Sequence, residues 1–380
     1  MHVDLKRLAV ASYQSLTRVR FSFRRLGVVL SFLMLFLPFE IWTWLCLKFD
    51  DLFFRGYRKV RVVEPVFIVG NPRSGTSFFH RLMAVNDRLF AGFCLHHIVF
   101  PAISQQRLLR WLGKLDRRLG SPGWRLVARI ERSLTRESDK IRRVHLTEPE
   151  EDEMVLVHAF ATSTLLMLFP GAPILVPLIR YDELDEKVRK PIERFYVGFL
   201  KRRLYLAGGN RRLLSKNTTF PTKIRSIRAL FPDARFIYLI RNPTVSIAST
   251  HDMFDRFWQL QFDRDEITRQ RQRLLETTCY LYQHALEELD QIPDGSKCIV
   301  QYEDLVTDPA GTVERVYRTL GLPPMDEEVR TRLDTLVGKA RGFKTRHQYS
   351  LASAGLTEQA IQEALPEVYS RFRFQERLDT

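Results

Sequence analysis

Residues 66–82 read VFIVGNPRSGTSFFHRL and decide the fold. The apolar run VFIVG predicts a buried strand, and the amphipathic run that starts at Thr76 predicts a helix. The turn between them matches the phosphate-binding pattern G-x-x-x-x-G-K-[ST] at Gly70, Gly75 and Ser77, but Thr76 stands where the pattern has its lysine. A glycine turn that opens a helix binds anions through its backbone N–H groups. The sequence therefore predicts an anion site that lacks the usual lysine.

Three further apolar runs, at 211–216, 234–240 and 297–305, each precede a helix-like segment. This alternation is typical of a parallel sheet covered by helices. We expect an α/β, P-loop-like three-layer fold with a central parallel sheet flanked by helices, plus an N-terminal hydrophobic membrane-associated helix. We expect the catalytic domain to span 60–380. Its helical insertion at 90–210 is expected to form an acceptor pocket, because pockets are built at the carboxyl edge of such sheets.

The first 50 residues divide into a basic arm, 1–25, and an apolar segment, 26–50. Only Glu40 and Lys48 carry charge in the run from 26 to 49, and the longest uncharged run of 14 residues is shorter than the ~20 that a span needs. Basic residues flank both ends, so the positive-inside rule gives no orientation. We expect membrane association through 26–50, as a single pass or as a monotopic anchor. A buried core helix is the weaker alternative.

The 380 residues include 59 Lys and Arg against 44 Asp and Glu, a formal charge of +15. This charge favours an anionic partner, which a nucleotide, a nucleic acid, an anionic lipid or a polyanion would satisfy equally. The four cysteines lack C-x-x-C spacing and a paired histidine framework. We therefore expect scattered buried thiols rather than a zinc site or disulfides at Cys46, Cys94, Cys279 and Cys298.

Cationic residues follow the predicted strands. Arg73 lies in the first turn, Lys216 ends the second strand and Arg241 ends the third. Because the carboxyl ends of parallel strands share one edge, we expect these side chains on one rim. A triphosphatase needs an acid after a neighbouring strand to hold magnesium, and this chain has Arg241 there. The sequence therefore predicts a cationic site without a metal.

Four stretches, in this order, resemble the sulfotransferases that use 3′-phosphoadenosine 5′-phosphosulfate (PAPS). FIVGNPRSGTSFFHRLM resembles the 5′-phosphosulfate loop of that family, and FIYLIRNPTVSIAST resembles its 3′-phosphate motif. The stretches at 300–323 and 346–356 are similar to its bacterial-type branch. The resemblance extends from 60 to 369, and the order and spacing of the motifs make it specific.

The resemblance implies a role for each matching residue. In the family, the loop binds the 5′-phosphosulfate, and its basic residue, here Arg73, neutralises the bridging oxygen as the S–O bond breaks. Lys216 matches the family's lysine after the second strand, but Thr218 stands where cytosolic members have a catalytic histidine. PAPS is the implied co-substrate, with no metal and no nucleic-acid partner. The implied donor-binding residues are Arg73, Ser74, Gly75, Thr76, Ser77, Arg241 and Ser249.

The acidic stretch TEPEEDE, 147–153, offers candidates for the general base. Thr147 and Glu150 have the spacing of a helix capping box, which would occupy Glu150. Glu151 shares a helical stripe with apolar residues, which would place its carboxylate against apolar surface. We expect Glu151 to be the base, although a solvated acidic face is an equal alternative. The other candidates are Glu150 and Glu153, followed by His80 and His145.

These observations predict a sulfotransferase that moves the sulfuryl group from PAPS to a hydroxyl or amine, with Glu151, Arg73 and Lys216 as catalytic residues. The anchor and the apolar run at 154–169, expected as a helix, favour a lipid or another amphiphile as acceptor, while the basic surface leaves a glycan open. One alternative is a kinase with a degenerate phosphate loop. Another is a non-catalytic membrane- or polyanion-binding protein on the same fold.

Overall fold

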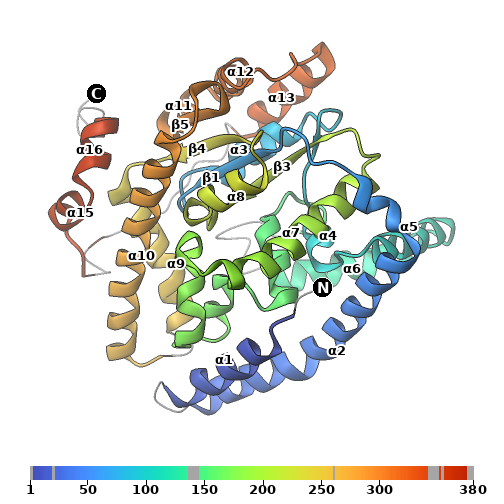
Figure 1. Cartoon of the computed structure of the whole chain (residues 1–380), viewed down its shortest axis with the longest axis horizontal. Coiled ribbons are helices and arrows are strands. Elements are labelled where there is room, and N and C mark those ends of the chain that lie inside the picture. Colours follow the sequence, from blue (N-terminus) through green and yellow to red (C-terminus); the bar gives the residue numbers. More distant parts are fainter. Residues whose placement is uncertain are drawn as a thin grey trace.

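A parallel five-stranded sheet lies at the centre of the molecule (Figure 1). The computed structural model describes residues 3–18, 22–135, 145–259, 262–340, 351 and 355–374. The strand order is β2-β3-β1-β4-β5. The strands are β1 (Val66–Gly70), β2 (Phe90–Ala91), β3 (Arg212–Asn217), β4 (Arg235–Ile240) and β5 (Lys297–Gln301). The four predicted strands are confirmed, but the fourth is shorter than the predicted 297–305, because α11 (Tyr302–Thr307) begins directly after it, and the short β2 is an addition.

The register aligns the ends of the three central strands. Ile68 on β1 pairs with Lys216 on β3 and with Ile237 on β4. The residues that follow β1, β3 and β4 therefore meet at the carboxyl edge of the sheet. Gly70 ends β1 where a Cβ atom would lie 2.5 Å from the carbonyl oxygen of Leu239, so only glycine fits between these strands.

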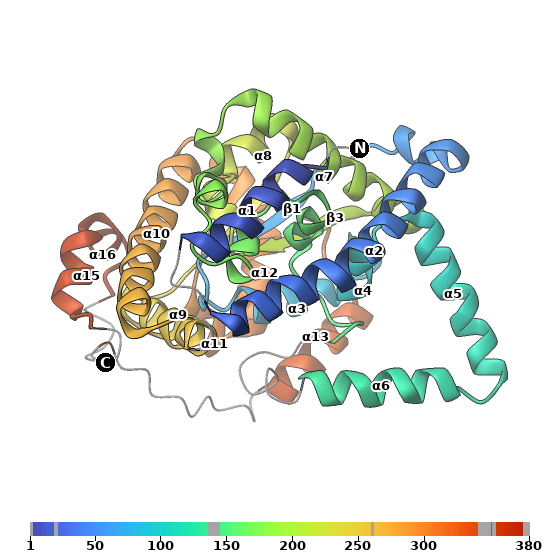
Figure 2. The ribbon, with the colours of Figure 1, turned by 90° about the horizontal axis from the view of Figure 1, so that it is seen from below.

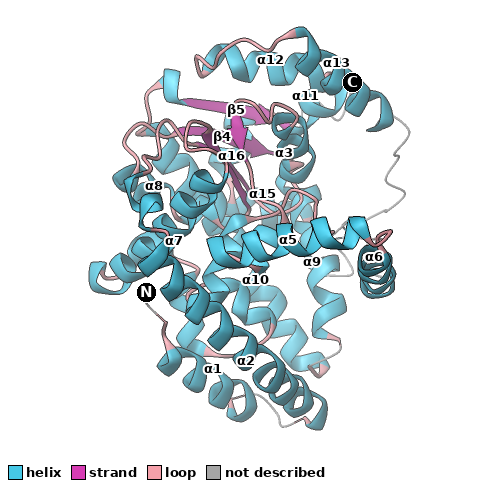
Figure 3. Ribbon diagram, turned by 90° about the vertical axis from the view of Figure 1, so that its right-hand side faces the viewer, coloured by secondary structure: helices cyan, strands magenta, loops and turns pink. Residues whose placement is uncertain are grey.

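Helices cover both faces of the sheet, because alternate strand residues point to opposite sides. On one face, Ile68 and Ile237 belong to an apolar cluster with residues of α3 (Thr76–Ala84), α12 (Pro309–Thr319) and α13 (Glu327–Ala340). Figure 3 shows the strands enclosed by these helices and those of the other face. The predicted three-layer α/β fold is confirmed.

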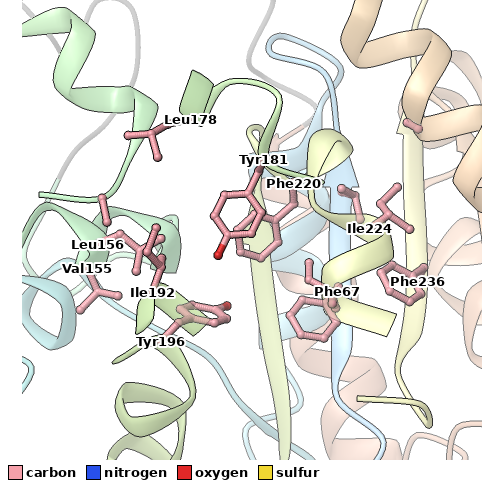
Figure 4. Close-up of a cluster of buried hydrophobic side chains, with 14 of the residues drawn as sticks. Phe67, Val155, Leu156, Leu178, Tyr181, Ile192, Tyr196, Phe220, Ile224 and Phe236 are labelled. Carbon is pink, nitrogen blue, oxygen red and sulfur yellow. The ribbon is translucent and has the colours of Figure 1, made fainter. Parts of the chain in front are cut away.

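The second face carries the larger apolar cluster. Phe67 and Phe236 stack there with ring centres 5.8 Å apart, and Ile224 packs beside them (Figure 4). This cluster continues into the insertion through residues such as Tyr196 and Leu156. The helices that cover this face are α7 (Glu186–Leu206), α8 (Ile224–Leu230) and α10 (Arg264–Asp290).

The insertion between β2 and β3 is mostly helical, but the run at 154–169 is not the single α-helix that we expected. Phe160 has a left-handed backbone with φ +52°, and the Thr162 hydroxyl accepts a hydrogen bond from the N–H of Thr164, which starts a new turn. The insertion contains α4 (Leu95–Val99), α5 (Ile103–Arg118), α6 (Pro122–Thr135), the 3-10 segments η3 (Asp152–Ala159), η4 (Ser163–Met167), η5 (Pro173–Leu178) and η6 (Tyr181–Glu183), and α7.

The N-terminal part is helical and lies at the end of the molecule opposite α11 and α12 (Figures 1 and 3). The helix α2 has 31 residues and is long and apolar enough to cross a membrane, with a mean hydropathy of 1.9 over its most apolar window. It contains the predicted segment 26–50. The remaining elements are α1 (Leu5–Thr17), α2 (Phe23–Phe53), η1 (Arg55–Lys59), η7 (Phe220–Thr222), α9 (Pro243–Trp258), η8 (Asp294–Ser296), α11 (Tyr302–Thr307), α15 (Glu358–Ala364) and α16 (Pro366–Phe372).

Candidate active site

The turn after β1 has the backbone of an anion-binding loop. Arg73 and Gly75 have φ values of +67° and +86°, and α3 begins directly after them at Thr76. The first N–H groups of a helix have no acceptor inside it, so those of Thr76 and Ser77 suit an anion. The buried Ser74 hydroxyl donates to the carbonyl of Asn71 and closes the turn.

Three of the predicted donor-binding residues contact one another. Arg73 Nε donates to Ser249 Oγ at 2.9 Å, and Arg241 Nη1 donates to the carbonyl oxygen of Arg73 at 3.1 Å. The Arg241 guanidinium also lies over the ring of Tyr302, 4.1 Å from its centre. The end of β4 and the start of α9 are thus joined to the loop after β1, and two arginines lie at the same edge of the sheet.

Sequence reasoning missed the contribution of Tyr302 and gave Ser246 no role. A Cβ atom on Gly75 would lie 2.8 Å from the Tyr302 ring, so this ring closes directly over the loop. Ser246 Oγ donates to the carbonyl oxygen of Pro72 at 2.9 Å and ties α9 to the loop. The motif at 300–323 contained Tyr302, but no spacing rule connected its side chain with the loop.

Lys216 and Glu151 form an ion pair at the end of β3. Lys216 Nζ lies 2.7 Å from Glu151 Oε1, and the side chain of Lys216 is fully buried while that of Glu151 is 13% exposed. Thr218 Oγ1 donates to Glu151 Oε2 at 3.0 Å. Thr218, at the position that the family resemblance gives to a histidine, therefore orients the carboxylate, and the ammonium group of Lys216 faces its other oxygen.

The local structure that we expected around the acidic stretch is wrong. Glu150 does not close a helix: its N–H donates to the carbonyl of Phe93 at 2.9 Å, and Pro149 forms a bridge with Cys94 in extended backbone. The segment η3 begins only at Asp152, and it is a 3-10 helix. The predicted capping box and the α-helical stripe through Glu151 are therefore absent, and Glu151 faces a lysine and a threonine instead of apolar residues.

Asp152 is the buried centre of the hydrogen bonds that fix this region. Its carboxylate accepts hydrogen bonds from Ser215 Oγ at 2.8 Å and Asn217 Nδ2 at 3.0 Å, and from the Tyr196 hydroxyl. Burial raises the pKa of Asp152 to about 6, although these hydrogen bonds lower it. Asp152 thus holds the end of β3 against η3 and positions the neighbouring Glu151. The sequence offered no signal that separated it from the other acids of the stretch.

The other candidates for the base have different surroundings. Glu153 is buried in an ion pair with Lys223 at 2.6 Å and accepts a hydrogen bond from Thr162. His145 Nδ1 lies 3.4 Å from a carboxylate oxygen of Glu131, on α6. His80 is buried on α3. Glu151 is the candidate whose carboxylate lies 2.7 Å from the ammonium group of Lys216, at the end of β3.

Cys94, His96 and His97 bring three potential metal-ligand atoms within 4.8 Å of one another. However, His97 Nδ1 already accepts a hydrogen bond from the N–H of Cys94 at 3.0 Å. Burial and the positive charge of Arg203 lower the pKa of His97 to about 2, and the same charge opposes a bound cation. We assign no metal to this cluster. Cys94 is half-buried, as is Cys46, so the prediction of four buried thiols holds only for the other two cysteines, and all four are free.

A family model described as the sulfotransferase family matches residues 65–327. The chain belongs to this family. The matched part of the chain contains the loop after β1, the Lys216–Glu151 pair and the Arg241 edge.

Two curated relatives of the chain, from Mycobacterium bovis and Mycobacterium tuberculosis, are each named omega-hydroxy-beta-dihydromenaquinone-9 sulfotransferase Stf3. They are 26% identical to the chain over 269 residues. The match covers 68% of the chain and 63% of each relative, so it spans less than two thirds of the relatives' length.

Solved structures show the same fold. Sulfotransferase STF9 from Mycobacterium avium superposes with a TM-score of 0.71 at 16% identity, over 98% of this chain and 97% of that one. Sulfotransferase STF1 from Mycobacterium tuberculosis H37Rv superposes with a TM-score of 0.64 at 17% identity, over 95% and 98%.

Proposed function

We propose that the chain transfers a sulfuryl group from PAPS to a hydroxyl group of a lipid or another amphiphile. The observation that carries this proposal is that two groups of side chains lie at the same edge of the sheet. They are the Arg73–Ser249–Arg241 cluster and the Lys216–Glu151 ion pair. The arginine cluster suits a doubly phosphorylated nucleotide. The ion pair places a carboxylate, as a candidate general base, beside a cation.

The residues of the loop fit the two anionic ends of PAPS. The start of α3 offers N–H groups and the hydroxyls of Thr76 and Ser77 to the 5′-phosphosulfate. Arg241 and Ser249 would hold the 3′-phosphate. Arg241 forms no ion pair with an acid in the described part of the chain, so its charge is available for a phosphate.

Transfer would proceed by in-line attack of the acceptor hydroxyl on sulfur. The Glu151 carboxylate takes the hydroxyl proton as the new O–S bond forms, and the bond between sulfur and the bridging oxygen breaks. The electron pair of that bond stays on the departing adenosine 3′,5′-bisphosphate. Arg73 and Lys216 stabilise the charge that develops there. Once Glu151 is protonated, it no longer neutralises the ammonium group of Lys216. That positive charge can then stabilise the negative charge on the leaving group.

The position of α2 supports an amphiphilic acceptor. Trp44 Nε1 on this helix donates to the carbonyl oxygen of His158 at 3.0 Å, and His158 belongs to η3, the segment that follows Glu151 directly. The apolar helix α2 therefore contacts the 3-10 segment that begins directly after the proposed base. The curated relatives are named for a hydroxylated menaquinone acceptor. We include membrane association through α2 in the proposed function, with a glycan as the second acceptor class.

Membranes incubated with the chain and PAPS labelled with radioactive sulfur would test the acceptor class. We expect the label in the lipid fraction, and at least ~100-fold slower labelling when the Glu151→Gln variant replaces the wild type. Label found only in the glycan fraction would mean that the acceptor is a glycan and not a lipid. Absence of label from the lipid, glycan and protein fractions, together with tight binding of adenosine 3′,5′-bisphosphate, would mean that the chain binds nucleotide without transfer.

A further inference from the structure

The long apolar helix α2 turns a polar stripe toward the protein. Its buried positions follow the helical period, so they lie on one side of the helix. They are Arg25, Val29, Glu40, Thr43, Leu47 and Asp50. Four of these six are charged or polar, although the helix as a whole is apolar. The face that α2 turns to the domain therefore combines these polar positions with partly buried apolar residues, such as Phe32 and Phe36, that pack on the main apolar cluster.

Glu40, at the middle of α2, is fully buried beside His158, with 2.7 Å between Glu40 Oε1 and His158 Nδ1. The other ring nitrogen of His158 lies 2.8 Å from the carbonyl oxygen of Ile98. Both ring nitrogens of His158 thus lie within hydrogen-bond distance of an oxygen, one from α2 and one from α4. The sequence left open whether a bilayer holds Glu40, and the structure places it inside the protein.

Both ends of α2 are fastened as well. At the start, Arg25 donates to the carbonyl oxygen of Ser15 at 3.2 Å. Near the other end, Asp50 accepts hydrogen bonds from the N–H groups of Ile103 at 2.6 Å and Ser104 at 3.0 Å, and its carboxylate pairs with Arg202. From residue 25 to 50 the helix rises ~38 Å, at ~1.5 Å per residue. It is attached to the domain over this whole length.

This attachment decides how α2 can meet a bilayer. A helix bonded to a polar domain along its length cannot cross a bilayer unless that domain enters the hydrocarbon, where its polar groups would lose their water. The outer side of α2 is apolar, with Met34 at 75% and Leu35 at 77% exposure. The helix is therefore suited to lie in the membrane plane with this side down.

The helices α5 and α6 extend this apolar surface. In Figure 2, α2, α5 and α6 outline three sides of one face of the molecule. The start of α5 is held by α2 through Asp50, and the rest of α5 and residues 122–133 of α6 are largely exposed. The exposed apolar residues recur at helical spacing on each helix. They are Leu108, Trp111, Leu112 and Leu115 on α5 and Trp124, Leu126, Val127 and Ile130 on α6, and Leu119, directly after α5, is exposed as well.

The arm formed by α5 and α6 is strongly basic. Residues 103–135 include eight Arg or Lys residues and two acids. Asp116 is used as a cap for the start of α6, where it accepts from the N–H of Gly123, and Glu131 accepts from the N–H of Leu146. None of the eight cations forms an ion pair with an acid in the described residues. Apolar stripes flanked by unpaired cations match the boundary between hydrocarbon and anionic headgroups.

We propose that α2, α5 and α6 form one membrane-binding surface, on which the protein lies in the plane of an anionic bilayer without crossing it. The proposal rests on the membrane association proposed above and extends it from one helix to three. A second copy of the chain is a poorer occupant, because two basic arms would repel each other. Since η3 contacts α2 through Glu40 and Trp44, this surface also brings the bilayer close to the segment that begins after Glu151.

Flotation of the full chain with vesicles tests the surface without donor or acceptor. We expect binding to vesicles of phosphatidylcholine with phosphatidylglycerol, and weaker binding to phosphatidylcholine alone or at high salt. The double variant Trp111→Glu/Leu115→Glu should bind the anionic vesicles about tenfold or more weakly. The control is Val306→Glu, which replaces an exposed apolar residue by one glutamate on α11, at the other end of the molecule (Figures 1 and 3). It should bind as the wild type does.

Unchanged binding of the double variant, with the same melting temperature as the wild type, would overturn the role of the arm. A wild type that forms dimers in sedimentation and does not float would assign the surface to a second copy instead. Quenching by brominated lipids then tests the in-plane arrangement: we expect Trp42, near the middle of α2, to be quenched more by bromine near the headgroups than near the bilayer centre, and the reverse would indicate a span. Vesicle binding without sulfuryl transfer would refute the proposed function and leave this surface standing.

Discussion

Replacing Arg241 by alanine removes the group that we propose for the 3′-phosphate of PAPS. Its guanidinium is held in place by the Tyr302 ring at 4.1 Å and donates one hydrogen bond, to the carbonyl oxygen of Arg73. In the proposed complex, its remaining N–H groups would donate one or two charge-assisted hydrogen bonds to the 3′-phosphate. Each such bond contributes ~1.5–3 kcal/mol, so Arg241→Ala should weaken binding of adenosine 3′,5′-bisphosphate by about ten- to a hundredfold per bond.

Titration calorimetry with two nucleotides separates this role from a structural one. Adenosine 5′-phosphosulfate lacks the 3′-phosphate, so its affinity should change little in Arg241→Ala. The control variant Arg241→Lys keeps the charge but loses the planar fork, and it should recover part of the affinity for adenosine 3′,5′-bisphosphate. If both nucleotides lost affinity equally, Arg241 would serve only to hold the loop through the carbonyl of Arg73, and the assignment of the 3′-phosphate site would be wrong.

Three further variants test the acidic stretch and the helix that packs on it. Glu151→Gln keeps an oxygen near Lys216 but cannot take a proton, so kcat should fall by ~10²–10⁴ with unchanged affinity for adenosine 3′,5′-bisphosphate, and an unaltered kcat would move the base elsewhere. Burial raises the pKa of Asp152 from 3.8 to about 6, so the folded state favours the protonated carboxyl group. The stability that this preference contributes, roughly 3 kcal/mol, is complete below about pH 4 and is lost as the pH rises through 6. Relative to the wild type, Asp152→Asn should therefore gain stability between pH 4 and 7 in denaturant titrations, whereas parallel pH curves would contradict the shift. Glu40→Ala leaves a buried histidine without its partner and should lower the free energy of unfolding by ~3–5 kcal/mol, against ~0.5 kcal/mol for the exposed neighbour Ile41→Ala; equal losses would mean that the pair is unimportant.

The sheet could be predicted because its strands are short apolar runs followed by loops with strong local signals. The loop after β1 contains two glycines at fixed spacing, and the cations Arg73, Lys216 and Arg241 each follow a strand. Parallel strands bring such positions to one edge whatever the rest of the fold does. The predicted rim of the site therefore followed from the topology alone, and the structure has these residues at the ends of adjacent strands.

The acidic stretch could not be read in the same way, because its conformation depends on distant partners. The capping-box spacing of Thr147 and Glu150 describes an isolated helix, but here Pro149 pairs with Cys94 and Asp152 is drawn to the end of β3. The same holds for α2. Its mean hydropathy predicts a membrane helix, while its attachment to the domain depends on partners far along the chain, such as Ile103 for Asp50 and His158 for Glu40. Tertiary contacts of this kind leave no local pattern in a single sequence.

The identity of the transferred group tests the central claim most directly. The purified full chain would be mixed with extracted membrane lipids and offered PAPS labelled in its sulfur together with Mg-ATP labelled in its γ-phosphate. We predict that the lipid acquires labelled sulfur, with one adenosine 3′,5′-bisphosphate released for each ester formed, and acquires no labelled phosphate. Labelled phosphate in the lipid without labelled sulfur would identify a kinase and contradict the account.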